Sequence, residues 1–242
     1  MGFYLLHEGM LDSVLYARDK FLKPGGLMFP ETAEIWAAPC SLPSHWDYWE
    51  NVYGVNMKCA GLAYRNIKSQ QPDIALIKPE DLLSTAHLIK AFDLTQITSQ
   101  ELDSIDSKTI VVAKKNGLYQ AICVYFICTF PSFDCDKNGS VTVTLSTAPA
   151  EPETHWKQTI IALPEQIEIE SKEPIAWEMS IVRDMQYRRH YDIRVTLLDA
   201  STENHPLPCN CYLTKCIVIK TYLEQTPDED SESDNNPIIE DD

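Results

Sequence analysis

The feature that most constrains the fold is a succession of short β-branched and aromatic segments that begins near residue 86. Turn signals such as Lys115-Asn116-Gly117 and Lys137-Asn138-Gly139 separate the segments. Short strands at this spacing are typical of an antiparallel sandwich or barrel. The expected strands lie within His87–Thr98, Thr109–Ala113, Ala121–Phe130, Ser140–Ser146, Thr159–Leu163, Ile167–Glu170, Ile175–Val182, Tyr191–Leu198 and Tyr212–Tyr222.

The first 85 residues have a different pattern. Apolar side chains at positions 10, 11, 14, 15 and 21 predict a helix over residues 8–21, ended by Lys23-Pro24-Gly25-Gly26. Strands are expected at Leu27–Phe29 and Ala33–Ala38, and a short helix at Pro79. Residues 41–70 are rich in aromatic side chains and predict an irregular or helical region.

The charge of the chain excludes some classes of partner. Asp and Glu number 36 against 20 Lys and Arg, giving a net charge of −16, and eight of the acids lie in residues 226–242, where there is no base. This tail also lacks aromatic residues, so we expect it to be disordered. The acidic balance argues against a general nucleic-acid binder or a protein that binds anionic membranes. The basic triplet Arg188-Arg189-His190 predicts a hairpin turn and not a nucleic-acid site.

Hydropathy bears on whether the chain spans a membrane, and the cysteines bear on its cellular compartment. The longest strongly apolar run, Ala121–Phe130, is about half the ~20 residues that a membrane helix needs. Without a secretory signal, the eight cysteines are expected to be reduced thiols in the cytoplasm and/or nucleus. Cys209-x-Cys211 and Cys216 raise the alternative of structural zinc, but no second pair follows at finger spacing. We therefore expect thiols and no metal site.

Three segments resemble motifs of the protein arginine methyltransferases. Met1–Met10 resembles the part of their double-glutamate loop that follows the E-W dipeptide, and Val14–Leu22 continues the family pattern. Trp49–Met57, with the letters W-E-N-V-Y-G-V-N-M, resembles the start of the dimerisation arm. Thr154–Thr159 resembles the T-H-W-K-Q loop of the type I enzymes.

The resemblance implies a mainly β fold. It consists of an antiparallel barrel-like sandwich, an N-terminal helix remnant of a Rossmann-type core and an inserted dimerisation arm. The expected division is a core remnant at 1–40, the arm at 41–85, a β-barrel substrate-binding domain at 86–225 and the tail at 226–242.

The resemblance also implies roles for four residues. Glu8 corresponds to the second of two carboxylates that grip the substrate guanidinium through charge-assisted bonds; the alternative is a helix-start acid. His155 would border the arginine pocket as a second catalytic residue, or be an ordinary surface histidine. Met10 and Trp156 would contact the substrate, Trp156 by cation–π stacking; their alternatives are core filler and a barrel-end tryptophan.

The implied activity is transfer of methyl groups from S-adenosylmethionine to arginine in Arg-rich, Arg/Gly-rich or histone-like proteins. The chain has eight glycines and no G-x-G-x-G stretch to hold the cofactor, so we expect it to be inactive alone. Residues 46–57 would form a homo-oligomer. The alternative is a non-catalytic binding or dimerisation module that captures Arg-rich proteins or a full-length relative.

Overall fold

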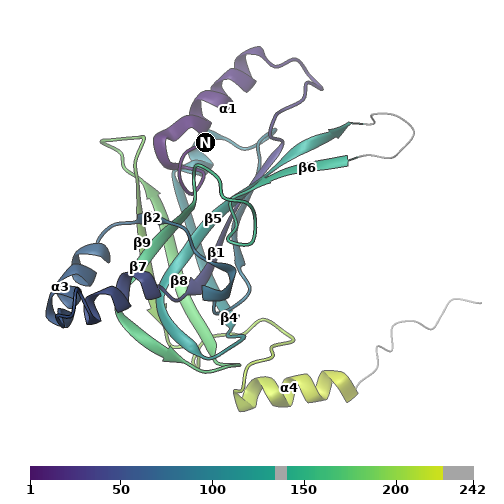
Figure 1. Cartoon of the computed structure of the whole chain (residues 1–242). Coiled ribbons are helices and arrows are strands. Elements are labelled where there is room, and N and C mark those ends of the chain that lie inside the picture. Colours follow the sequence, from purple (N-terminus) through teal and green to yellow (C-terminus); the bar gives the residue numbers. More distant parts are fainter. Residues whose placement is uncertain (134–140, 226–242) are drawn as a thin grey trace, which may run out of the picture.

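The chain folds into two antiparallel sheets with a few helices (Figure 1). The computed structural model describes residues 1–133 and 141–225; the tail predicted to be disordered lies outside them. In chain order the elements are η1 (His7–Gly9), α1 (Met10–Phe21), β1 (Thr32–Cys40), α2 (Pro43–Trp46), η2 (Asp47–Glu50), α3 (Lys58–Lys68), β2 (Asp73–Ala75), η3 (Pro79–Asp81), β3 (His87–Asp93), η4 (Ser99–Leu102), β4 (Ser104–Val112), β5 (Gly117–Phe133), β6 (Val141–Ser146), β7 (Gln158–Ile169), β8 (Pro174–Arg183), β9 (Tyr191–Leu198) and α4 (Thr214–Gln225).

The long strand β5 organises the larger sheet. Strand order is β2-β7-β5-β1-β3, and β6 pairs with the second half of β5. The smaller sheet has the order β4-β8-β9. The mainly β, antiparallel architecture is as predicted; closure into a barrel stays a prediction, and so do the domain boundaries. β1 lies inside the larger sheet, between β5 and β3.

One apolar core joins the two sheets. Ile35 of β1, its cross-strand partner Phe126 of β5 and Trp177 of β8 belong to a single buried cluster. Helix α1 adds Leu11 and Leu15, which are one helical turn apart and are its buried residues. The core therefore fixes where α1 and the preceding loop lie on the β sheets.

Strand β7 explains why two expected strands are one. The patterns at Thr159–Leu163 and Ile167–Glu170 merge into a single element that contains Pro164. The pairing of β7 with β5 shifts register between Tyr119 and Ala121, opposite this stretch. A bulge tolerates proline because no ladder hydrogen bond is needed there.

Two expected strands are wrong. Leu27–Phe29 takes no strand conformation, and Leu27 and Phe29 are exposed. Tyr212–Tyr222 lies mostly in helix α4. Both runs consist of β-branched or apolar residues, but neither pairs with a neighbouring strand. β propensity reflects packing on a sheet more than an intrinsic backbone preference, so composition alone did not make these runs strands.

The helices are short. None of those in residues 1–133 and 141–225 has the length and hydropathy that crossing a membrane requires.

Candidate functional site

The N-terminal loop is strained and anchored in the core. Tyr4, Leu5 and Leu6 are almost fully buried, whereas Tyr4, Leu5 and Glu8 have positive φ angles of 42°, 74° and 74°. Such conformations cost of order 1 kcal/mol or more per residue and gather at functional sites. Burial of the three side chains turns the chain so that Glu8 comes to the surface.

The turn between β8 and β9 holds Glu8. The Glu8 amide donates to the Arg189 carbonyl at 2.8 Å, and Arg189 Nε donates to the Glu8 carbonyl at 3.1 Å. In the part of the chain that the structure describes, no cationic side chain forms an ion pair with the Glu8 carboxylate. Its backbone is thus fixed while both carboxylate oxygens remain available to a ligand.

The basic triplet is a hairpin turn, as predicted, and it has a second contact with the loop. The imidazole of His190 stacks on that of His7, with ring centroids 5.4 Å apart. Burial lowers the pKa of His7, and the neighbouring His190 lowers it further. The Tyr4 hydroxyl lies 3.4 Å from His7 Nδ1. Sequence reasoning did not bring this histidine pair together, because 183 positions separate its members.

A buried arginine ties α1 to the smaller sheet. Arg183, at the end of β8, is 2% exposed and binds both carboxylate oxygens of Asp12 on α1. Its Nε lies 2.8 Å from an Asp103 carboxylate oxygen. Sequence analysis missed Arg183; the available signal was a cation directly after the apolar run of β8. The residue fixes the start of α1, and hence Glu8, against the β sheets.

The T-H-W loop meets the chain's first residue. Trp156 Nε1 donates to the Met1 carbonyl at 2.8 Å, and the Trp156 ring packs edge-on against Phe126 with centroids 5.5 Å apart. These contacts favour the structural alternative for Trp156. His155 is exposed beside it, and Met10 is 45% exposed and not part of the core.

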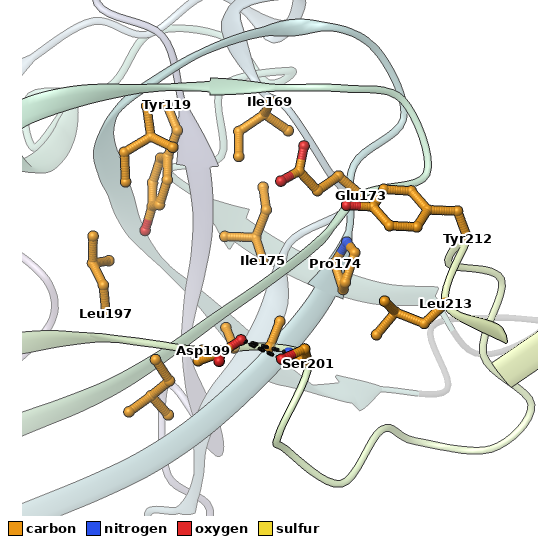
Figure 2. Close-up of a pocket in the computed structure, with 14 residues that line it drawn as sticks. Tyr119, Ile169, Glu173, Pro174, Ile175, Leu197, Asp199, Ser201, Tyr212 and Leu213 are labelled. Atoms are coloured by element: carbon orange, nitrogen blue, oxygen red, sulfur yellow. Dashed lines mark hydrogen bonds between the residues drawn. The ribbon is translucent and has the colours of Figure 1, made fainter. Parts of the chain in front are cut away.

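The cavity of Figure 2 lies elsewhere. It has a volume of about 240 Å³ and is lined by residues from β5, β7, β8 and β9 and from the segment before α4. Most of the lining residues are apolar, with Glu173 and Asp199 among the polar ones. None of its lining residues belongs to the loop around Glu8 or to the T-H-W loop. It is therefore not the place where those motifs act.

The aromatic arm is partly folded onto the chain. Trp46 is buried, and the Arg65 guanidinium stacks on its ring. Trp49 packs on α3 at Gly61, where an added Cβ would lie 2.7 Å from the Trp49 Cβ. Tyr53, by contrast, is 99% exposed. The base of the arm, at Trp46 and Trp49, is thus packed on the chain, whereas its tip, around Tyr53, is uncovered.

Residues 31–201, well over half of the chain, match the family described as the arginine methyltransferase oligomerization subdomain. The chain belongs to the arginine methyltransferase family. Protein arginine N-methyltransferase 6 of Xenopus laevis is 36% identical to it over 188 residues, which are 75% of this chain and 53% of the frog protein. The arginine methyltransferase chain therefore spans about half the length of the curated relatives it matches.

Solved structures agree with this arginine methyltransferase fold. A crystal structure of PRMT6-SAH superposes with a TM-score of 0.64 at 26% identity, over 82% of this chain and 65% of that one. A Trypanosoma brucei PRMT1 enzyme-prozyme heterotetrameric complex with AdoHcy gives 0.67 at 24% identity, over 85% and 64%. The second likeness concerns the fold alone.

Proposed function

We propose that this chain is the arginine-binding and dimerisation part of a protein arginine methyltransferase. The complete enzyme transfers a methyl group from S-adenosylmethionine to arginine side chains of Arg-rich proteins. The observation that carries the proposal is Glu8, a surface carboxylate on a left-handed turn whose backbone is hydrogen-bonded to Arg189, in a loop that resembles the family's double-glutamate loop. The net charge of −16 also favours cationic substrates over acidic ones.

Glu8 would act by orienting the substrate. A guanidinium is planar and presents parallel N–H bonds that match the two oxygens of a carboxylate. Because the Glu8 amide donates to Arg189 and the Glu8 carbonyl accepts from it, the β8–β9 turn holds the backbone that carries the carboxylate. Its negative charge stabilises the cationic substrate and fixes which nitrogen is presented for methylation. Met10 and His155, both exposed, would lie at the edge of the substrate site, while Trp156 supports it.

The residues of this chain do not fit the cofactor. The family's glycine-rich loop follows a strand and opens a helix, whereas Gly25 and Gly26 lie in the turn after α1. The sequence has no G-x-G stretch at any position. We therefore derive no step through S-adenosylmethionine in this chain; the complete enzyme would bind it with other residues.

A second candidate function is assembly without catalysis. The match to an oligomerization subdomain and the uncovered arm tip at Tyr53 and Val55 favour a chain that docks on a relative. The arm of residues 46–57 would supply the contact. This role is compatible with the first proposal and does not need Glu8.

The experiment that tests the first proposal uses a chimera in which a cofactor domain from a close relative precedes residue 1. Methylation of an Arg-rich peptide is measured for the parent, for Glu8→Gln and for Glu165→Gln, a control that neutralises an exposed acid on β7. Glu8→Gln should lower kcat at least about 100-fold, or about 2.7 kcal/mol of transition-state stabilisation, and the control should not. Turnover of Glu8→Gln within about threefold of the parent would show that Glu8 is a helix-start acid.

A further inference from the structure

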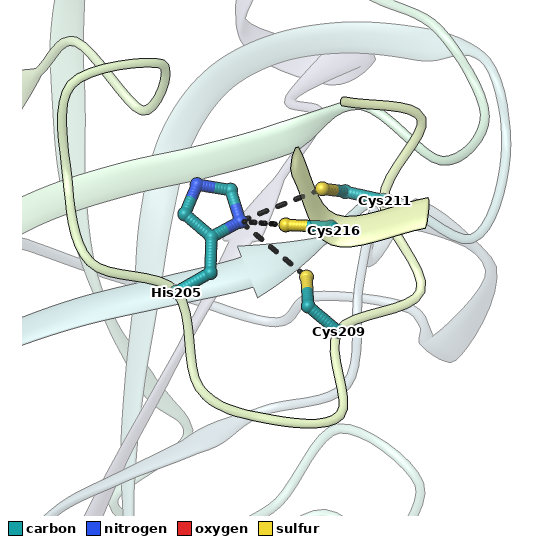
Figure 3. A group of neighbouring side chains, drawn as sticks. All are labelled: His205, Cys209, Cys211 and Cys216. Carbon is teal, nitrogen blue, oxygen red and sulfur yellow. Dashed lines mark hydrogen bonds between the residues drawn. The ribbon is translucent and has the colours of Figure 1, made fainter. Parts of the chain in front are cut away.

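Four metal-ligating side chains meet in the segment between β9 and α4 (Figure 3). The ligand atoms of His205, Cys209, Cys211 and Cys216 all lie within 4.8 Å of one another. His205 Nδ1 is 3.4 Å from the sulfurs of Cys209 and Cys211 and 3.3 Å from that of Cys216. The three cysteines are buried and form no disulfide.

A contact of His205 Nε2 indicates which ring nitrogen faces the three sulfurs with its lone pair. His205 Nε2 lies 2.7 Å from the Ala200 carbonyl oxygen. A carbonyl can only accept, so Nε2 is the nitrogen that donates, and in the neutral imidazole Nδ1 is then the nitrogen with the free lone pair. Figure 3 shows this Nδ1 facing all three sulfurs. A histidine whose second nitrogen donates to a backbone carbonyl is the usual arrangement at a metal ligand.

Hydrogen bonding alone does not account for the arrangement. Nδ1 has one lone pair and can accept one well-directed hydrogen bond, from a single thiol. A single tetrahedral ion does account for it. Zinc bonds of about 2.3 Å to sulfur and about 2.0 Å to nitrogen place the two kinds of ligand atom roughly 3.5 Å apart. The observed separations of 3.3–3.4 Å match that edge.

We propose that His205, Cys209, Cys211 and Cys216 bind one structural zinc ion. The four ligands are one nitrogen and three sulfurs, a set that closes a tetrahedral site and leaves no open position for a substrate. Three thiolates and Zn²⁺ carry a net charge of −1, and Lys172 lines the cavity beside Cys209 and Cys211; Lys220 also lines it but forms an ion pair with Glu224. The assignment replaces the expectation of plain thiols, and it is independent of the proposed methyl transfer.

The zinc site would anchor helix α4 and the loop before it, which have few other buried contacts. Cys216 is the buried residue of α4, whereas Ile217, Val218 and Leu223 of that helix are 51%, 60% and 47% exposed. The satellite cluster around the site consists of the three cysteines with Val112 and Leu213 at its edge. A metal that joins residue 205 to residue 216 would close this loop and attach α4 to the end of the β sheets.

The ligand spacing is His-x3-Cys-x-Cys-x4-Cys. This spacing differs from the two C-x2-C pairs of a zinc finger, so the zinc-finger pattern does not detect it. The signal that could have found the site is the presence of His205 four residues before Cys209, together with the short distance in sequence to Cys216.

The test measures metal content of the full chain, purified under reducing conditions and dialysed against zinc and then against metal-free buffer. We expect about one zinc ion per chain by mass spectrometry of the metal. Cys216→Ser and His205→Ala should each lower the content at least tenfold. Cys59→Ser, which removes an exposed thiol on α3, should retain it, and His205→Cys should also retain it because a fourth thiolate replaces the imidazole.

Two further measurements protect the test against variants that fail to fold. Cobalt substitution of the wild-type chain should give the intense visible absorption of a tetrahedral sulfur-rich site. Removing zinc with a chelator should speed proteolysis within residues 199–225 by at least about tenfold. A wild-type chain with less than about 0.1 zinc ion, an octahedral cobalt spectrum, or iron–sulfur absorption would each overturn the proposal.

Discussion

Arg183 and Asp12 form a two-point ion pair that joins the end of β8 to the first turn of α1. The Arg183 side chain is 1% exposed and that of Asp12 is 31% exposed. A charge as deeply buried as this guanidinium needs its partners, because water cannot replace them. The pair thus determines the position of the helix that follows Glu8.

Removing the charge of Asp12 should therefore destabilise the fold. For Asp12→Asn we expect a loss of about 3 kcal/mol in the free energy of unfolding, since a buried cation loses its main partner. Asp19→Asn is the matched control: Asp19 pairs with Arg18 but is 66% exposed, so its loss should cost less than about 1 kcal/mol. Chemical denaturation of the full chain gives both values, and equal losses would contradict the account.

Trp156→Phe tests whether the tryptophan is structural. The variant keeps an aromatic ring against Phe126 but removes the donor to the Met1 carbonyl, at a cost of about 1 kcal/mol. Hydrogen exchange in residues 1–8 should speed up. In the control Trp36→Phe, the lost indole donor binds the Glu34 side chain instead, so exchange in the loop should not change. Unchanged hydrogen exchange in residues 1–8 of Trp156→Phe would contradict the structural role and favour stacking of Trp156 on the substrate guanidinium.

The histidine pair predicts a pH dependence of stability. The pKa of His7 is lowered in the folded state, first by burial and then by His190, so the unfolded chain binds the proton more tightly. His7 then contributes stability that is present above its ordinary pKa of about 6.5 and is lost as pH falls through the lower folded pKa. His7→Asn should flatten this part of the stability profile between about pH 7 and pH 5. An unchanged slope would show that His7 is not involved.

The arm predicts association through its tip. Tyr53→Ser should raise the monomer fraction in sedimentation without changing the unfolding free energy, because Tyr53 is 99% exposed. Trp49→Ser should destabilise α3 as well, since Trp49 packs on Gly61. Tyr16→Ser, an exposed tyrosine of α1, serves as control. A wild-type chain that is monomeric at all concentrations would remove the basis of this prediction.

The cofactor prediction concerns the chain of residues 1–242 alone. Because it offers no glycine-rich loop, we expect no binding of S-adenosylmethionine tighter than about 100 μM, or about −5.5 kcal/mol. Isothermal calorimetry measures this directly. The chimera described above is the positive control, and tight binding by the chain alone would mean that another set of residues holds the cofactor.

Sequence patterns predicted those elements that depend on local signals. Tyr191–Leu198 is β9 with the same bounds, and the helix expected over residues 8–21 is η1 and α1. Local signals failed at Tyr212–Tyr222, where the β-branched residues of α4 face no neighbouring strand. They could not pair Glu8 with Arg189 or His7 with His190, because those contacts depend on how the β8–β9 turn packs on the loop. The role of Glu8 itself is a prediction from the motif that no contact yet tests.

The bond between Glu8 and Arg189 has a consequence for synthesis. The two residues are 181 positions apart, and at about 5–20 residues per second a ribosome needs roughly 10–40 s to make the intervening chain. During that interval the left-handed turn at Glu8 has no β8–β9 turn to hold it, and Trp156, which binds Met1, also arrives late. The surface that would grip the arginine therefore takes shape only after Arg189 has been made, long after its own carboxylate.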